Sequence, residues 1–267
     1  MVTRDTTVDR LDPDQISANL KTKRVGRKVL VYRSTSSTND VAARYGRNRE
    51  NDGLAVFAEE QTAGRGRAGS RWQSGKGDSI LCSIVLAGSV PHHHLLSLAC
   101  AVAVAEAIGP AGAARHAKIK WPNDIMLDGK KVAGILVESK AGRDGGFCVV
   151  GIGINCHQRA DSFAQELREI ATSIDVESHS TTDRISLARR LLTCLDHWLE
   201  VAQKSSKEVI DRWSELSVQL GQRTALVFNG VKFTGQCVGI DPEKGLILRL
   251  DSGGVRMFDA AHTTVAK

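Results

Sequence analysis

The pattern of hydrophobic residues changes near Gly221, and this change constrains the fold more than any other feature of the sequence. Before it, β-prone apolar runs alternate with longer segments whose apolar residues recur at helical spacing. After it, short β-prone runs are separated by Asn-Gly, Pro-Glu-Lys-Gly and Ser-Gly-Gly turns at 229–230, 242–245 and 252–254. Strands joined by such turns at near-regular spacing are typical of a small β-barrel. The sequence therefore predicts a larger α+β part followed by a small barrel.

The same pattern predicts individual helices and strands. Apolar residues at helical spacing make 95–108 the strongest helix prediction. Ser37 or Thr38 is a suitable N-cap for a helix over 39–45. Trp198 and Trp213 lie among apolar neighbours at helical spacing, so we expect both in the core. Further helices are expected at 14–20, 184–201 and 207–216, and strands at 28–32, 54–59, 79–86, 119–121, 125–127, 131–138, 147–154, 224–228, 232–239, 245–250 and 255–259.

Composition narrows the class of protein. No stretch has the roughly 18–20 uncharged apolar residues of a membrane helix, and the N-terminus lacks the apolar run of a secretory signal. The six cysteines form no Cys-x-x-Cys pair, so we expect reduced thiols and a cytoplasmic protein. The net charge is +6, but lysines and arginines are dispersed. We therefore expect no nucleic-acid partner and no membrane partner.

A run of three histidines, His92-His93-His94, has to be weighed as a metal site. Consecutive histidines ahead of a helix cannot all face one ion, and no carboxylate or cysteine is spaced to help them. We therefore expect no protein-bound metal.

The segment 61–76 is the most polar stretch between two expected strands. It is rich in Gly, Ser and Arg, with Arg65, Arg67 and Arg71 close together before Trp72. Glycines let a backbone approach a ligand closely, and arginines offer planar forks to carboxylate or phosphate oxygens. The segment is expected to be a mobile loop suited to closing over an anionic substrate, with a solvated basic loop as the alternative.

Three later segments place polar residues at strand ends. In Lys-Trp-Pro-Asn-Asp at 120–124, Asn123 can both donate and accept hydrogen bonds, and Asp124 can position a nucleophile, although such sequences also form ordinary turns. Lys131 opens an apolar strand, where it is either a surface lysine or a point charge for a phosphate. Asn155 ends another apolar strand after a Gly-Ile-Gly sequence, which alone is weak evidence.

Taken together and in order, these segments resemble the signature of biotin protein ligases. The resemblance covers about residues 27–267 and implies a mixed β-sheet catalytic domain flanked by helices, like that of class II aminoacyl-tRNA synthetases, with a small C-terminal SH3-like β-barrel. The implied divisions are a polar, frayed segment at 1–26, a catalytic biotin- and ATP-binding domain at 27–220 and the barrel at 221–267. The matching residues are Ser37-Thr38-Asn39, Gln61, Gly64 to Trp72, 120–124, 131–138 and 151–155.

One position departs from the family's loop, which often reads Gly-Arg-Gly-Arg-x-Gly-Arg-x-Trp. Ser70 stands where the third arginine is common, and Arg71 follows it. Arg65 and Arg67 are retained.

The resemblance implies a biotin–[biotin carboxyl-carrier protein] ligase that works in two half-reactions. Biotin and ATP first give biotinyl-5′-AMP and pyrophosphate, with Mg²⁺ arriving with ATP. A specific lysine of a biotin carboxyl carrier domain of a carboxylase then attacks the adenylate. The enzyme is expected in the cytoplasm, with a homodimer left open.

The resemblance also assigns roles to single residues. The catalytic residues would be Arg67, Lys131 and Asp124. The biotin-binding residues would be Ser37, Thr38, Asn39, Gln61, Arg65, Gly66, Arg67, Lys131 and Gly134. The ATP-binding residues would be Arg67, Trp72, Asn123, Lys131 and Asn155, and no residue is assigned to a metal.

Two alternatives remain at this stage. A lipoate-type ligase shares the acyl-adenylate chemistry and a related fold, although the arginine loop and 120–124 favour biotin. A biotin-responsive regulator without its DNA-binding domain is the other. Family members with that role carry an N-terminal helix-turn-helix domain, and the roughly 26 residues ahead of the first expected strand are too few for a three-helix DNA reader. We therefore expect the monofunctional form and no specific operator binding.

Overall fold

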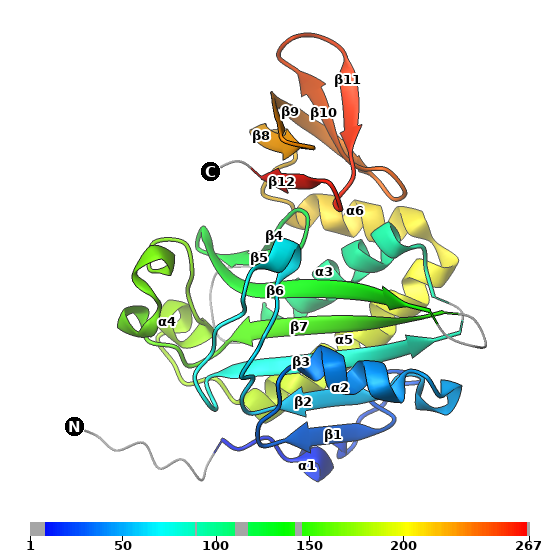
Figure 1. Ribbon diagram of the computed structural model, residues 1–267, viewed down its shortest axis with the longest axis vertical. Helices are drawn as coiled ribbons and strands as arrows, with labels where there is room; N and C mark the ends of the chain where they lie inside the picture. The colour runs from blue at the N-terminus through cyan, green and yellow to red at the C-terminus, as the bar shows by residue number, and fades with distance from the viewer. Residues whose placement is uncertain (1–8, 89, 110–116, 142–145, 266–267) are drawn as a thin grey trace.

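The computed structural model describes residues 9–88, 90–109, 117–141 and 146–265, which form two β-sheets and the helices around them (Figure 1). The larger sheet has seven strands in the order β1-β2-β3-β7-β6-β5-β4. Strands β1 and β2 pair in parallel, and the other neighbours are antiparallel. The strands are β1 Val29–Tyr32, β2 Ala55–Ala58, β3 Ser79–Ala87, β4 Lys118–Lys120, β5 Asp124–Leu127, β6 Lys130–Lys140 and β7 Phe147–Asn155.

Helices cover both faces of the larger sheet (Figure 1). Helix α2 packs on β2, β3 and β7 from one face, and α3 packs on β4, β5 and β6 from the other. Helices α5 and α6 pack on α3 as a further layer. The helices are α1 Pro13–Ser17, α2 Thr38–Tyr45, α3 His93–Ile108, α4 Ile174–Ser178, α5 Arg184–Lys204 and α6 Ser206–Leu216, with short 3-10 turns at Arg49–Asn51, Arg67–Gly69, Ala160–Ser162 and Gln165–Leu167.

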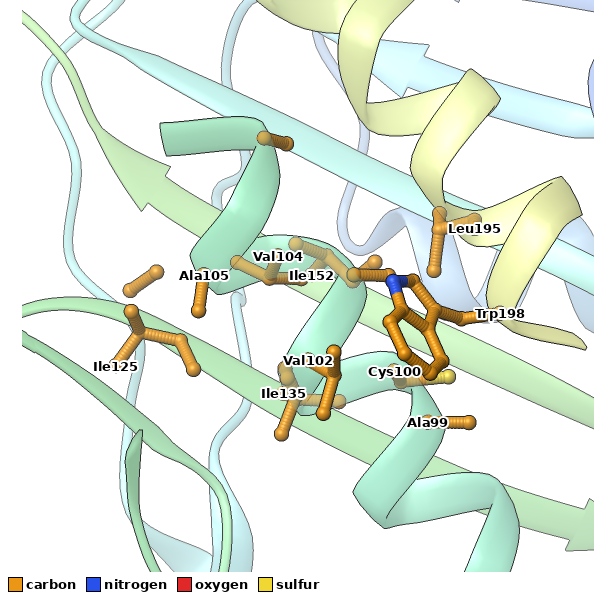
Figure 2. Packing of buried hydrophobic residues seen from close by; sticks show 14 of the residues in the cluster. Ala99, Cys100, Val102, Val104, Ala105, Ile125, Ile135, Ile152, Leu195 and Trp198 are labelled. Atoms are coloured by element: carbon orange, nitrogen blue, oxygen red, sulfur yellow. The ribbon is translucent and has the colours of Figure 1, made fainter. Parts of the chain in front are cut away.

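Helix α3 is the centre of the core because it is apolar on all sides. Its small residues, such as Ala99 and Val102, let it lie between the sheet and α5 (Figure 2). Ile135 of β6 packs on the sheet side and Trp198 of α5 packs on the other. The indole Nε1 of Trp198 donates to Glu106 Oε2 at 2.8 Å, which satisfies the one polar atom of that ring. A helix that is apolar all round is expected to be buried, as this one is.

The smaller sheet follows α6 and has five antiparallel strands in the order β11-β10-β9-β8-β12. Its core includes the rings of Phe228, Phe233 and Phe258, with the Arg256 guanidinium 4.4 Å from the centre of the Phe233 ring. The sequence predicted four of the five strands and missed β12. The strands are β8 Arg223–Phe228, β9 Val231–Asp241, β10 Gly245–Leu250, β11 Val255–Phe258 and β12 Thr263–Val265.

The predicted fold class is confirmed: a mixed sheet flanked by helices is followed by an antiparallel sheet of the SH3-like kind. Trp198 and Trp213 are both buried, as expected, and all six cysteines are free thiols. The domain boundary that we propose near Gly221 falls between α6 and β8. Within the described part of the chain, no helix has the length and hydrophobicity needed to cross a membrane.

The expectation of a frayed N-terminal segment is wrong for residues 9–26. Leu11, Ile16 and Val25 are buried in the main core, since α1 packs on α5 and β1. Asp9 accepts a hydrogen bond from Arg184 Nε at 2.8 Å and contacts His157 Nε2 at 2.5 Å. Charges at the surface of this segment gave it a polar composition, but Leu11, Ile16 and Val25 face inward. Residues 1–8 lie outside the described part of the chain.

Candidate active site

A pocket of about 230 Å³ lies between the arginine loop (64–72), the start of α2 and strands β6 and β7. Every site residue predicted from the sequence lines it except Asn155. These residues come from five separate segments, so the fold brings together motifs that are up to about a hundred positions apart in the chain. They are Ser37, Thr38, Asn39, Gln61, Arg65, Gly66, Arg67, Trp72, Asn123, Asp124, Lys131 and Gly134.

Glycines of β6 and β7 form one wall of this pocket. A Cβ added at Gly153 would overlap the indole of Trp72, and one added at Gly151 would overlap the Asn39 amide. At Gly134 it would lie 3.0 Å from Trp72 Cζ3. Alternate residues of a strand point to one face, so Gly151 and Gly153 leave bare backbone on the same side of β7. The alternation of glycines in an apolar strand was the sequence signal for this wall.

The start of α2 supplies a polar wall that is already hydrogen-bonded. Gln61 Oε1 accepts from the Thr38 backbone N–H at 2.7 Å and from Thr38 Oγ1 at 3.0 Å. Ser83 Oγ lies 2.7 Å from Thr38 Oγ1 and 2.6 Å from Asn39 Oδ1. Ser83 comes from the middle of buried β3, and nothing in the motif pattern marked it. These contacts fix the orientation of the side chains that face the pocket.

The arginine loop is a closed hairpin with its own hydrogen bonds. The Gly66 N–H donates to the Ser70 carbonyl at 2.7 Å, and the Trp72 N–H donates to the Gly64 carbonyl at 3.1 Å. The turn between them uses the left-handed region at Ala68, with φ of 50°, and at Gly69, with φ of 76°. Ser70 Oγ donates to the Arg67 carbonyl at 2.7 Å. The serine that departs from the family pattern therefore closes the turn.

Two cations, Lys131 and Arg67, line the pocket beside Asp124 and Asn123. Lys131 Nζ lies 2.5 Å from Asp124 Oδ1 and 5.7 Å from the centre of the Trp72 ring. Arg67 Nη1 donates to Asn123 Oδ1 at 3.3 Å, and its Nη2 contacts the backbone carbonyl of Ala260 from the smaller sheet. Burial lowers the pKa of the Arg67 guanidinium, which nevertheless stays protonated at any physiological pH. Arg65 and Arg71 also line the pocket, so cations outnumber Asp124 in the lining and the pocket presents a net positive charge to an incoming anion.

Arg65 differs from Arg67 because its guanidinium is already paired. Its Nη1 and Nη2 donate to the two carboxylate oxygens of Asp40 at 2.9 and 2.7 Å. Glu138 Oε2 lies 3.6 Å from Nη2 and also accepts from Asn39 Nδ2 at 3.1 Å. Hydrogen bonding to Arg65 lowers the pKa of Asp40, and hydrogen bonding to Asp40 raises that of Arg65. The sequence reasoning assigned no role to Asp40, which directly follows the Ser-Thr-Asn motif, or to Glu138, which ends the 131–138 segment.

A second pocket of about 380 Å³ adjoins the first, with Trp72 and Lys131 lining both. Its apolar lining includes Phe163, Leu167 and Ile170 from the segment after β7. Asn155 lies here rather than in the first pocket. Its Nδ2 donates to the Thr172 carbonyl at 2.9 Å, and its Oδ1 accepts from Gln158 Nε2 at 3.1 Å. The amide is therefore engaged with protein groups in this structure.

The three histidines line a separate groove beside Asn123 and Ala260. The rings of His92 and His94 are stacked with centres 6.1 Å apart. Among the residues that the structure describes, no group of three or more His, Cys, Asp or Glu side chains is arranged to hold a metal ion.

Comparisons with known proteins agree with this geometry. The model of the biotin/lipoate A/B protein ligase family matches residues 31–155. The bifunctional ligase/repressor BirA of Bacillus spizizenii is 34% identical over 94% of this chain and 78% of its own length. The biotin–[acetyl-CoA-carboxylase] ligase of Mycobacterium tuberculosis is 32% identical over 96% of this chain and 97% of its own.

Solved structures show the same relationship. The biotin protein ligase from Aquifex aeolicus in complex with biotin and ATP has a TM-score of 0.77 and 26% identity. The match covers 90% of this chain and 99% of the Aquifex chain. Since relatives above 30% identity align along nearly the whole length and the structures share the fold, this chain belongs to the biotin protein ligase family.

Proposed function

We propose that the two adjoining pockets carry out the two half-reactions of a biotin protein ligase. The protein activates biotin with ATP to biotinyl-5′-AMP and then transfers the biotinyl group to a protein lysine. The observation that carries this proposal is the position of Lys131 and Trp72, which line both pockets at their junction. A biotin carboxylate in the first pocket and a nucleotide in the second would meet beside Lys131.

Arg67 and Lys131 are the proposed catalytic cations. The first half-reaction brings a carboxylate onto an α-phosphate, so two anions must approach each other. Positive groups fixed at that point offset the repulsion and the charge that develops in the transition state. Lys131 is held there by its backbone, whose N–H donates to the Ile170 carbonyl at 2.8 Å and whose carbonyl accepts from the Thr172 N–H at 2.9 Å. Mg²⁺ arrives as part of the MgATP substrate.

The polar wall is proposed to recognise the biotin ring system. A ureido group presents donors and an acceptor that a dry pocket must match. Ser37, Thr38, Asn39 and Gln61 offer such groups, and the first three are buried at about 3% exposure each. The bare backbone of Gly134 and Gly153 lets the Trp72 indole lie against β6 and β7, where it forms one side of the pocket proposed to hold the ring system.

The second pocket is proposed to receive the nucleotide. Its apolar side chains and the Trp72 ring suit a purine base, while Lys131 lies toward the phosphates. Asn123, at the edge of the first pocket, is proposed to contact the nucleotide as well. Asn155 contributes by supporting this wall, since its amide bonds to Thr172 and Gln158.

Asp124 is proposed to act in the second half-reaction. Its carboxylate pairs with Lys131 at 2.5 Å, so it lies where an incoming acceptor lysine would compete with Lys131 for the same partner. Such a carboxylate orients the amine and can take its proton. We further propose that the acceptor is the biotin carboxyl carrier domain of a carboxylase, since the M. tuberculosis relative is named for acetyl-CoA-carboxylase.

The family members named above use biotin, so biotin is the substrate rather than lipoate. The Bacillus relative is a ligase and repressor, so a regulatory role remains the second candidate. That no operator DNA is bound and that the protein is cytoplasmic stay predictions, and a homodimer stays open.

Pyrophosphate release with biotin, lipoate or octanoate tests the proposed activity. Purified protein with MgATP should release pyrophosphate with biotin and form biotinyl-AMP, and it should then label a carrier domain at its acceptor lysine. Release with lipoate or octanoate but not with biotin would overturn the assignment. A sequence-specific, biotin-dependent shift of duplex DNA would instead support the regulatory candidate.

A further inference from the structure

Arg65 is the arginine of the loop whose charge is already neutralised. Both terminal nitrogens donate to Asp40 in a two-pronged contact, at 2.9 and 2.7 Å, with Glu138 Oε2 another 3.6 Å from Nη2. Such fork-to-fork pairs fix orientation as well as distance. A guanidinium held in this way has little capacity left for a carboxylate or phosphate of a substrate.

Asp40 belongs to a helix that is packed against the larger sheet. It lies in the first turn of α2, which packs on β2, β3 and β7, and it follows Asn39, whose side chain lines the pocket. Arg65, in contrast, lies at the start of the hairpin that ends at Trp72. The pair therefore ties one end of the loop to the base of the pocket, two residues before Arg67.

Glu138, on β6, is a second and more distant partner of Arg65, and it is shared with other side chains. Its Oε2 accepts from Asn39 Nδ2 at 3.1 Å and lies 3.7 Å from Lys140 Nζ. The loop therefore depends on Asp40 for its ion pair with the helix.

We propose that Asp40 is a positioning residue that holds the arginine loop over the pocket through Arg65, and that Arg65 serves as this anchor rather than as a ligand of the substrate anions. The proposal rests on the proposed ligase activity and concerns how its intermediate is retained. Both side chains are about 40% exposed, so water weakens the pair, which can break and re-form in each catalytic cycle.

The expected effect follows from that exposure. Half-exposed pairs change an equilibrium by about 5-fold at most, which is about 1 kcal/mol at 1.4 kcal/mol per tenfold. Asp40→Asn and Arg65→Ala should each raise KM for biotin and speed the loss of biotinyl-AMP from the enzyme by about 5-fold. The kcat for adenylate formation should change by less than about 2-fold, because Arg67 and Lys131 remain in place.

The charge-swapped double variant Asp40→Arg/Arg65→Asp is the decisive test. It restores an ion pair between the same two positions, so an anchor role predicts that adenylate retention and KM return to within about 2-fold of wild type. If the swapped protein stays as impaired as Arg65→Ala, Arg65 acts on the substrate directly and the proposal is overturned. Asp251→Asn breaks a comparably short exposed pair, Arg223–Asp251 at 2.6 Å in the smaller sheet, and should change neither quantity.

Amide hydrogen exchange across 61–76 in the ligand-free protein separates this proposal from the proposed function. Asp40→Asn should lower protection of the loop relative to wild type even if no adenylate is ever formed. Unchanged protection would overturn the anchor, whatever the activity. A wild-type protein that forms no biotinyl-AMP would overturn the proposed function and leave this comparison valid.

Discussion

Two clusters of charged residues in this molecule are built in opposite ways. In the pocket, the side chains of Lys131 and Asp124 are 34% and 27% exposed. Behind the N-terminal segment, those of Arg184 and Glu59 are only 3% and 7% exposed. Water reaches the pocket pair and keeps it weak and exchangeable, whereas the Arg184–Glu59 pair is shielded from water, and Asp9, at 31%, is the exposed member of its cluster. The difference separates charges that can take a substrate from charges that hold the fold.

The buried cluster joins five parts of the chain. Arg184 Nη1 donates to Glu59 Oε2 at 2.8 Å, and Arg184 also binds Asp9 through its Nε. His157 lies between Asp9 and Asp175, with Nδ1 2.7 Å from the Asp175 carboxylate. Glu59 Oε1 accepts from the Leu11 N–H at 2.7 Å, so the cluster also fastens the N-terminal segment. Each carboxylate has a fixed partner, which is the condition under which buried charges are tolerated.

Removing one buried charge should have the largest effect. Arg184→Ala leaves Glu59 and Asp9 without their main cationic partner and should lower the free energy of unfolding by about 3–5 kcal/mol. Denaturant titration measures this change in the free energy of unfolding. Arg223→Ala, which breaks an exposed pair with Asp251, is the matched control and should leave the free energy of unfolding nearly unchanged. Equal losses in the two variants would contradict the distinction between the clusters.

Removing a pocket cation should have the opposite effect: a large loss of catalytic rate and little loss of stability. Lys131→Ala and Arg67→Ala should each slow biotinyl-AMP formation by about 100- to 1000-fold, because each removes a fixed charge at the reacting anions. Stability should change little, since Lys131 is partly exposed and its backbone contacts remain. Single-turnover kinetics and thermal melting measure the two quantities. Wild-type rates in both variants would show that the catalytic cations lie elsewhere.

Alkaline pH should weaken the buried cluster more than the pocket. Burial opposes protonation of His157, but hydrogen bonds to Asp175 and Asp9 outweigh it and raise the pKa to about 9. A raised histidine pKa stabilises the fold fully below its unfolded value of about 6.5 and loses that contribution as pH rises through 9. The loss should be on the order of 3 kcal/mol.

The measurement is the denaturation midpoint of wild type and His157→Gln between pH 6.5 and 9.5. The difference in stability between the two proteins should shrink as the pH rises. A constant difference across that range would mean that His157 is neutral in the folded protein.

Closure of the arginine loop should give the smallest energetic effect. Like charges at Arg67 and Arg71 repel one another, and the phosphate of biotinyl-AMP relieves that repulsion. Biotin plus ATP should therefore increase amide protection across 61–76 sharply, and ATP alone should do so little. Equal protection in the free protein would mean that Trp72 is placed by a preformed pocket and not by a closing lid.

The sequence predicted the parts of this molecule that depend on local pattern. The helix over 95–108 and the β7 run could be read from periodicity, and the motif residues could be placed through resemblance. Ser83 could not, because it reaches the site only through the packing of α2 on β3. Asp40 follows the Ser-Thr-Asn motif, but its pairing with Arg65 depends on the fold. Strand β12 has three residues and no alternation long enough to detect.

The buried cluster around Arg184 also could not be predicted from the sequence. Arg184 opens an amphipathic helix, where an arginine normally faces water, and Asp9 lies in a polar segment that was expected to fray. Their burial is set by contacts between residues that are 175 positions apart. The local sequence around either residue does not predict such a pair.

The placement of the four tryptophans gives this protein a built-in optical reporter. Trp121, Trp198 and Trp213 are buried at 2%, 8% and 0% exposure, so ligand binding in the pockets should leave their fluorescence emission unchanged. Trp72 alone among them lines both pockets, and Lys131 Nζ lies 5.7 Å from its ring. Quenching or a spectral shift of intrinsic fluorescence on titration would therefore follow ligand arrival at a single known ring, without any label. A Trp72→Phe protein would supply the blank for that signal.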